Sequence, residues 1–119
     1  MYFEGRELKP YAEPIEFDFL KEGSVYFSVT FIDEKMHIPQ MEPFVFIGCG
    51  LSDTDTSDIY FQDVDSFEAG VRFNTATDAD NANFLRISKN ELSCIFEFDR
   101  ALEVLMTCSL RRANAQGKL

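Results

Sequence analysis

The segment from Val25 to Ile32 alternates in side-chain character with a period of two residues, and this pattern constrains the fold more than any other. One set of alternate positions is entirely large and apolar, namely Val25, Phe27, Val29 and Phe31. Successive side chains of a strand point to opposite faces of its sheet, so the segment is predicted to be a half-buried strand. Phe44–Ile47 is apolar at every position, which is typical of a strand covered on both faces. Ile59–Gln62 is predicted to be a further short strand.

Two prolines separate the first two of these segments. Proline has no backbone N–H and is found mainly on edge strands, so Pro39 and Pro43 predict an edge or a break before Phe44. Gly48 and Gly50 follow the apolar run, and they predict a bend or bulge at the end of that strand.

The C-terminal third predicts a hairpin followed by a helix. Phe84–Ser88 and Leu92–Phe98 flank the polar turn Lys89–Glu91, as in two strands joined by a tight connection. Asp99 is expected to cap the helix that follows. The apolar stripe of that helix, which is expected to cover the sheet, comprises Leu102, Leu105, Met106 and Leu110.

A second, shorter helix is predicted near residues 64–72, where Asp65 and Glu68 have the spacing of a capping box. The predicted fold class is therefore α+β, with a mostly antiparallel sheet of about five or six strands packed against the C-terminal helix. We expect one domain over 1–119, with an extended lead-in over 1–15 and a frayed tail over 113–119.

Composition narrows the class of partner. The chain has 119 residues, 45% of them hydrophobic, and a net charge of −10 from 21 acidic and 11 basic residues. Such a charge disfavours nucleic acid and anionic membranes, because Lys and Arg supply most of the affinity for both. The N-terminus has no basic start with an apolar stretch, and the cysteine count of three is odd, so a cytoplasmic location is expected.

The acidity is concentrated in the middle of the chain. Residues 53–80 hold eight acidic side chains and one basic side chain, Arg72, which gives this stretch a net charge of −7. A strongly negative stretch attracts a basic surface and speeds association. We therefore expect a small non-catalytic protein-binding domain that neutralises or regulates a basic partner. The residues predicted to bind this partner are Asp53, Asp55, Asp58, Asp63 and Asp65.

An alternative is a calcium or small-ligand site in the acidic loop over residues 53–65. Asp53, Asp55 and Ser57 have the one-three-five spacing of an EF-hand loop. However, the sixth position is Asp58 where glycine is needed, and the twelfth is Val64 where a bidentate Glu belongs. This excludes an EF-hand and leaves only a looser cation site as the alternative.

Catalytic and cofactor signals are weak. Gly48 and Gly50 are an incomplete dinucleotide fingerprint, since the third glycine is missing. Cys49 could act as a nucleophile only with His37 as its base, and no motif orients the pair. We therefore expect neither enzymatic activity nor a cofactor.

Aromatic side chains on outward strand positions suggest a further hypothesis. Tyr26, Tyr60 and either Phe44 or Val45 would form an apolar patch if one face of the sheet were open. Large apolar patches are uncommon on monomers, so the pattern also predicts self-association or partner binding through the sheet.

Overall fold

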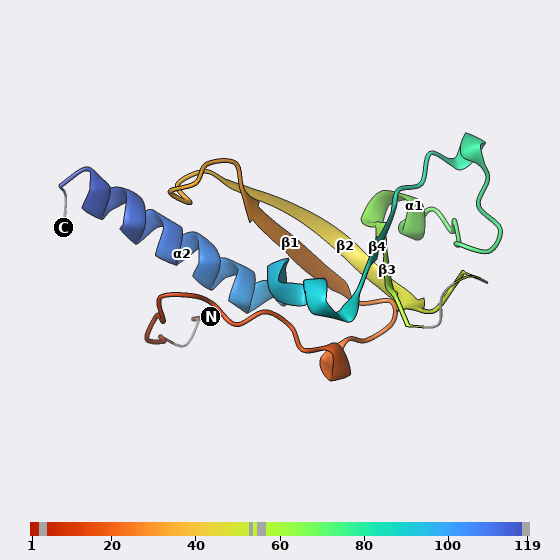
Figure 1. Ribbon diagram of the computed structural model, residues 1–119, viewed down its shortest axis with the longest axis horizontal. Coiled ribbons are helices and arrows are strands. Elements are labelled where there is room, and N and C mark those ends of the chain that lie inside the picture. The colour runs from red at the N-terminus through yellow and green to blue at the C-terminus, as the bar shows by residue number, and fades with distance from the viewer. Residues whose placement is uncertain (3–4, 53, 55–56, 118–119) are drawn as a thin grey trace.

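The computed structural model describes residues 1–2, 5–52, 54 and 57–117 of the chain. Its five strands form one sheet in the order β4-β3-β2-β1-β5, and every neighbouring pair is antiparallel (Figure 1). The strands are β1 (Val25–Phe31), β2 (Pro39–Cys49), β3 (Ile59–Asp63), β4 (Phe84–Ile87) and β5 (Ile95–Phe96). The helices are α1 (Val64–Glu68) and α2 (Phe98–Ala115), with short 3-10 helices η1 (Phe17–Phe19), η2 (Asp78–Asp80) and η3 (Lys89–Cys94). The predicted α+β class is confirmed.

Of the two alternatives predicted for Pro39 and Pro43, the edge is confirmed and the break is wrong, because β2 runs without interruption through both prolines. β1 pairs with β2 along its whole length, from Phe31 opposite Pro39 to Val25 opposite Val45. β3 pairs with β2 only from Phe44 onward. The proline-containing half of β2 therefore has a neighbouring strand on one side only, where proline is tolerated.

The predicted bulge at the end of β2 is confirmed. The register with β3 shifts between Phe46 and Gly48. Gly48 has a φ of +138° and Gly50 a φ of +60°, conformations that residues with a Cβ rarely adopt.

The predicted hairpin between residues 84 and 98 is wrong, because β4 and β5 lie at opposite edges of the sheet. The connection between them contains η3 and runs from one edge of the sheet to the other, so it is not a hairpin turn. Ser88 and Glu91 begin this helix with a reciprocal capping box, in which the Glu91 carboxylate accepts from the Ser88 N–H at 3.0 Å. Leu92 of η3 is buried, which anchors the crossing segment on the sheet.

The short helix α1 lies where it was predicted, but its cap is Asp63 and not Asp65. The Asp63 carboxylate accepts from the Ser66 N–H at 3.0 Å and from the Ser66 hydroxyl at 2.5 Å. Asp65 lies inside the first turn and is exposed. The helix therefore starts one residue after β3 ends.

The predicted aromatic patch is wrong, because its residues are covered by other parts of the chain. The face that carries Tyr26 is open only toward the tip of the β1–β2 hairpin, where Thr30, Gln40 and Glu42 are exposed. Tyr26, Tyr60 and Val45 are all buried. Tyr26 belongs to a core cluster that also contains Ile15 from the N-terminal segment and Leu92 from η3. The largest exposed apolar side chains lie elsewhere on the molecule.

α2 packs on the sheet through small side chains and not through the predicted stripe of leucines. Ala101, Val104 and Cys108 are buried, whereas the leucines of α2 are at least a third exposed. Small residues let the helix approach the sheet closely, and large side chains from β1, such as Phe27 and Phe31, fill the space between them. The predicted stripe therefore faces solvent.

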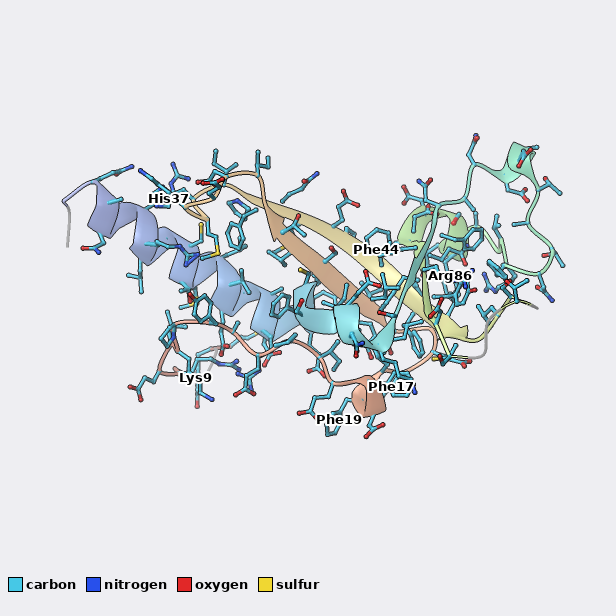
Figure 2. The ribbon with its side chains drawn as sticks, in the orientation of Figure 1. Lys9, Phe17, Phe19, His37, Phe44 and Arg86 are labelled. Atoms are coloured by element: carbon cyan, nitrogen blue, oxygen red, sulfur yellow. The ribbon has the colours of Figure 1, made fainter. Side chains whose placement is uncertain are left out.

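The molecule is elongated, measuring 52 × 31 × 28 Å along its principal axes. α2 extends to one end of the long axis, and α1 and η2 lie at the other end (Figure 1). The tip of the β1–β2 hairpin, marked by His37 in Figure 2, lies beside the C-terminal half of α2. There the Cys108 thiol and the Arg111 guanidinium both approach the Met36 carbonyl oxygen, at 3.5 and 3.2 Å.

Candidate functional site

The main candidate site is an exposed apolar surface on α2, which we call the apolar face of α2. Its members, with their exposed fractions, are Phe98 (64%), Leu102 (45%), Leu105 (37%), Met106 (41%) and Leu110 (47%). Residues spaced by three, four and seven positions lie on one side of a helix. The face therefore runs along α2 and lies mainly on the side away from the sheet. Phe98, at its N-terminal end, also packs edge-to-face against Phe27 of β1, with 4.8 Å between the ring centres. Exposed contiguous apolar surfaces mark interaction sites more often than single exposed side chains do.

α2 is fixed in place by a network of charges at its N-terminal half. The buried Glu103 carboxylate accepts from Arg6 Nη1 at 2.7 Å and from Arg100 Nη1 at 3.1 Å. Arg6 also pairs with Asp99 at 3.0 Å, which ties the N-terminal segment to the helix. The hydrogen bond from Arg6 lowers the pKa of Glu103 from its ordinary value, against the opposing effect of burial. Asp99, predicted as the cap, instead follows the capping residue Glu97 by two positions.

The two ends of the apolar face carry opposite charges. Glu97 and Asp99 lie at the N-terminal end of α2, and Arg111 and Arg112 lie at its C-terminal end. Arg111 is held by the Met36 carbonyl and by the Phe31 ring, with 5.5 Å from its guanidinium carbon to the ring centre. Arg112 makes no hydrogen bond or ion pair to another described side chain and is exposed.

Of the five acidic residues predicted to bind a basic partner, the three that the structure describes differ in their surroundings. Asp53 and Asp55 lie outside the described residues. Asp58 pairs with Arg86 on β4 at 2.6 Å, and Figure 2 shows Arg86 at this edge of the sheet. Asp63 caps α1, and Asp65 is exposed to solvent. Two of the three described residues therefore have structural partners.

Asp63 has a clear structural role. Its carboxylate accepts from the backbone N–H of Asn83 at 2.8 Å as well as from Ser66, and so joins α1 to the segment leading into β4. Burial of this carboxylate opposes its ionisation, but the hydrogen bonds from Ser66 and Asn83 outweigh burial and lower the pKa of Asp63.

Other carboxylates remain exposed at the end of the molecule that carries α1. They are Asp65, Glu68, Asp78 and Asp80. The basic side chain in this part of the chain, Arg72, stacks on the Phe67 ring at 4.1 Å and donates to the Phe67 and Val71 carbonyls. We call the surface formed by these four carboxylates the acidic end.

The side chains that could bind a metal ion or act in catalysis do not cluster in the described part of the chain. Within residues 1–2, 5–52, 54 and 57–117, no group of three or more His, Cys, Asp or Glu side chains is placed to hold a metal ion. His37 precedes β2 and Cys49 ends it, so about 35–40 Å of extended chain separates them. The pairing of Cys49 with His37 considered from the sequence is therefore wrong. The looser calcium site stays a prediction, because it depends on Asp53 and Asp55.

The fold and these surfaces define an α+β domain in which α2 packs on an antiparallel sheet and presents an apolar face to solvent. In comparisons with known proteins, no family model, no curated protein and no solved structure matches the chain. Among the helices of the described residues, none is both long enough and apolar enough to cross a bilayer.

Sequence reasoning found four of the five residues of the apolar face but assigned them to the core, and it placed the fifth, Phe98, in the predicted strand Leu92–Phe98. The signal that could have corrected this is a second stripe on the same helix, formed by Ala101, Val104 and Cys108. Only one of two apolar stripes on a helix packed against a single sheet can be buried. The leucines were predicted to be buried because they are the larger apolar residues. In the structure, the smaller residues are buried, because they let the helix pack closely on the sheet.

Proposed function

We propose that this chain is a non-catalytic protein-binding domain that forms a homodimer through the apolar face of α2. The observation that carries the proposal is the row of five large apolar side chains, each more than a third exposed, on an otherwise well-anchored helix. Transfer of apolar surface out of water is the main favourable term in protein association.

The three cysteines form no disulfide, which supports placing the protein in the cytoplasm.

A second copy suits this face because of how the charges are distributed along α2. In an antiparallel pair related by a two-fold axis, the N-terminal end of each helix meets the C-terminal end of the other. Glu97 of one copy would then lie near Arg112 of the other, and the opposite ends of the two helix dipoles would also be matched. The same alignment places Phe98 against Leu110 and Leu102 against Met106 of the second copy.

The oligomeric state tests this proposal. Sedimentation velocity at tens of micromolar should give the mass of two 13.7 kDa chains for the native protein. Leu105→Glu should give the mass of one chain, because a charge at the centre of the interface would be buried without a partner. Glutamate is a good helix former, so α2 should stay folded in this variant.

The matched control is Ala79→Glu, which adds the same charge at the exposed helix η2, far from α2. It should remain a dimer. A native protein that sediments as a monomer, or a Leu105→Glu variant that stays a dimer while its circular dichroism is unchanged, would contradict the proposal.

A second candidate function is recognition of a basic partner at the acidic end. It is supported by the four exposed carboxylates there and by the engagement of Arg72 with Phe67, which leaves their charge uncompensated. In the antiparallel dimer the two acidic ends would point in opposite directions, so that one dimer could engage two basic surfaces.

An oligolysine peptide is a suitable probe of the acidic end. Amide NMR shifts should be concentrated in residues 63–80, and Asp65→Asn with Glu68→Gln should weaken binding and reduce its salt dependence. Unchanged binding by this double variant, or shifts concentrated at β1 and η1, would show that the acidic end does not bind the basic partner.

A further inference from the structure

A cavity of about 330 Å³ lies between α2, the sheet and the N-terminal segment. Its wall is mostly apolar: Val29 and Phe31 come from β1, Phe96 from β5 and Val104 from α2. Ala12 of the N-terminal segment also lines the cavity and packs against the same group of side chains. Cavities of about 300–1,000 Å³ with apolar walls and a few polar groups are typical of small-molecule binding sites. The size and lining of this cavity therefore suit a small ligand with an apolar part.

The charge of the lining indicates the other part of such a ligand. Among the described residues that line the cavity, the only charged one is Arg111 of α2. The lack of a carboxylate there is informative, because the whole chain has 21 acidic residues and a net charge of −10. A cationic group beside apolar walls is complementary to a molecule that joins an anionic group to an apolar chain.

Two contacts place the Arg111 guanidinium at the cavity wall. Nε donates to the Met36 carbonyl at 3.2 Å, and the guanidinium carbon lies 5.5 Å from the centre of the Phe31 ring. Met36 and Phe31 both line the cavity. Arg111 also lines an adjoining hollow of about 400 Å³, together with Tyr11 and Leu110, and it is partly exposed. Arg111 therefore lies where the cavity meets the adjoining hollow, and part of it is accessible to water.

The terminal nitrogens of Arg111 are available to an anion. Neither Nη1 nor Nη2 donates to another described residue, and Arg111 forms no ion pair with a described carboxylate. A guanidinium presents a planar fork of N–H donors that matches the two oxygens of a carboxylate. Arg111 can therefore bind a carboxylate through Nη1 and Nη2 while Nε keeps its bond to Met36.

We propose that this cavity binds a medium-chain fatty acid anion, with its alkyl chain along the apolar wall and its carboxylate paired with Arg111. Burial of the alkyl chain would supply the apolar part of the affinity. The cavity volume is near the lower end of the range for ligand sites, which favours a chain of moderate length. The site is independent of the proposed dimer, because none of the five side chains of the apolar face of α2 lines this cavity.

Octanoate and octan-1-ol form a matched pair of probes, since they have carbon chains of equal length and differ in the charge of the head group. In ¹H–¹⁵N NMR titrations of the full chain, octanoate should bind about tenfold more tightly, because a charge-assisted hydrogen bond to Arg111 is stronger than one to a hydroxyl. Hexanoate should bind about tenfold more weakly than octanoate, because its shorter chain buries less apolar surface. The largest shifts should include the backbone amides of Phe31 and Val104 and the Nε–H of Arg111.

Substitution of Arg111 tests the carboxylate contact. Arg111→Gln should weaken octanoate binding about tenfold and leave octan-1-ol binding unchanged, and the second result would show that the cavity is intact. The matched control is Arg112→Gln, which removes the same charge from the next residue along α2, a residue that does not line the cavity. Its affinity for octanoate should equal that of the native protein.

A variant that fills the cavity tests the place of the alkyl chain. Ala12→Phe adds a ring to the cavity wall without changing α2 or the sheet, and it should weaken the binding of both probes at least tenfold. Ala79→Phe adds the same ring at the exposed helix η2 and should leave both affinities unchanged.

Each part of the proposal can be overturned. Equal affinity for octanoate and octan-1-ol, or an equal loss of both in Arg111→Gln, would show that Arg111 does not hold the carboxylate. Absence of octanoate binding at millimolar concentration would show that the cavity takes no fatty acid anion. Octanoate shifts that lie away from the cavity, or an octanoate affinity that is unchanged in Ala12→Phe, would place the binding elsewhere.

Discussion

At the scale of single residues, the carboxylates that hold the fold together are distinct from those that face solvent. Glu103 is buried on α2 and binds two arginines, one of them 97 positions away in the sequence. Asp63 joins α1 to the segment before β4. Neither role was predictable from the sequence, because each depends on a partner that the fold brings near.

Glu103 makes the stability of the protein depend on pH. The pKa of this carboxyl is lower in the folded protein than its ordinary value of 4.5, chiefly because of the Arg6 hydrogen bond. Its contribution is therefore complete above pH 4.5 and is lost as the pH falls through the folded-state pKa. Glu103→Gln should lower the free energy of unfolding by about 1–2 kcal/mol at pH 7 and by less in acid.

Urea unfolding between pH 7 and pH 3 measures this effect. The exposed variant Glu34→Gln is the control, and its stability should follow that of the native protein at each pH. A Glu103→Gln variant whose loss of stability is the same at pH 3 as at pH 7 would show that the ion pairs do not stabilise the fold.

Asp63 supports a prediction about α1. Asp63→Ala removes the acceptor for Ser66 and Asn83 and should destabilise the protein by about 1–2 kcal/mol, whereas Asp63→Asn keeps a capping oxygen and should cost less. Asp65→Ala should have little effect, because that side chain is exposed and does not cap the helix. Thermal unfolding of the three variants distinguishes Asp63 from Asp65 as the cap, and equal melting temperatures would reject the assignment.

At the scale of elements, local sequence patterns predicted whether a segment is a helix or a strand better than they predicted which elements lie beside it. Strict alternation predicted β1, because a period of two is a direct consequence of strand geometry. The segment 84–98 was wrongly predicted to be a hairpin, because a tight turn and a capped 3-10 helix both begin with polar residues. The Ser88–Glu91 capping box was present in the sequence and was read as a turn.

The same limit applies to the candidate site. Helical spacing identified α2 and every residue of its apolar face except Phe98, but not which of its two stripes meets the sheet. That choice depends on the volume supplied by β1, which is a tertiary property. The exposed surface that now carries the proposed function could therefore not be distinguished from core by the sequence alone.

The proposed pairing of α2 predicts the effect of charge reversal at the ends of the helix. Arg112→Glu should weaken the dimer several-fold, because Glu97 of the second copy would then face a like charge. Adding Glu97→Arg in the same chain should restore the affinity. The side chain of Glu97 makes no capping hydrogen bond, so its replacement should leave α2 intact.

Sedimentation equilibrium of the two single variants and the double variant measures this coupling, and Glu34→Arg serves as a charge-matched control away from α2. If the double variant were as weak as the sum of both single changes, the two side chains would not lie near each other. Antiparallel pairing would then be rejected.

At the scale of the whole molecule, charge and apolar surface are separated along the long axis. The acidic end lies with α1 and η2, and the apolar face lies along α2 toward the opposite end (Figure 1). This separation allows the two surfaces to act independently, since a copy bound at α2 would leave the acidic end exposed. The domain could then hold two basic partners in one assembly.

The central claim is that two copies associate through antiparallel α2 helices. Isotope-filtered NOESY on an equimolar mixture of ¹³C-labelled and unlabelled protein detects contacts between copies without any substitution. Antiparallel pairing of α2 predicts intermolecular contacts from the Phe98 ring to the Leu110 methyl groups and from Leu102 to Met106. Intermolecular contacts that join Phe98 to Phe98, or the absence of any such contact on α2, would contradict it.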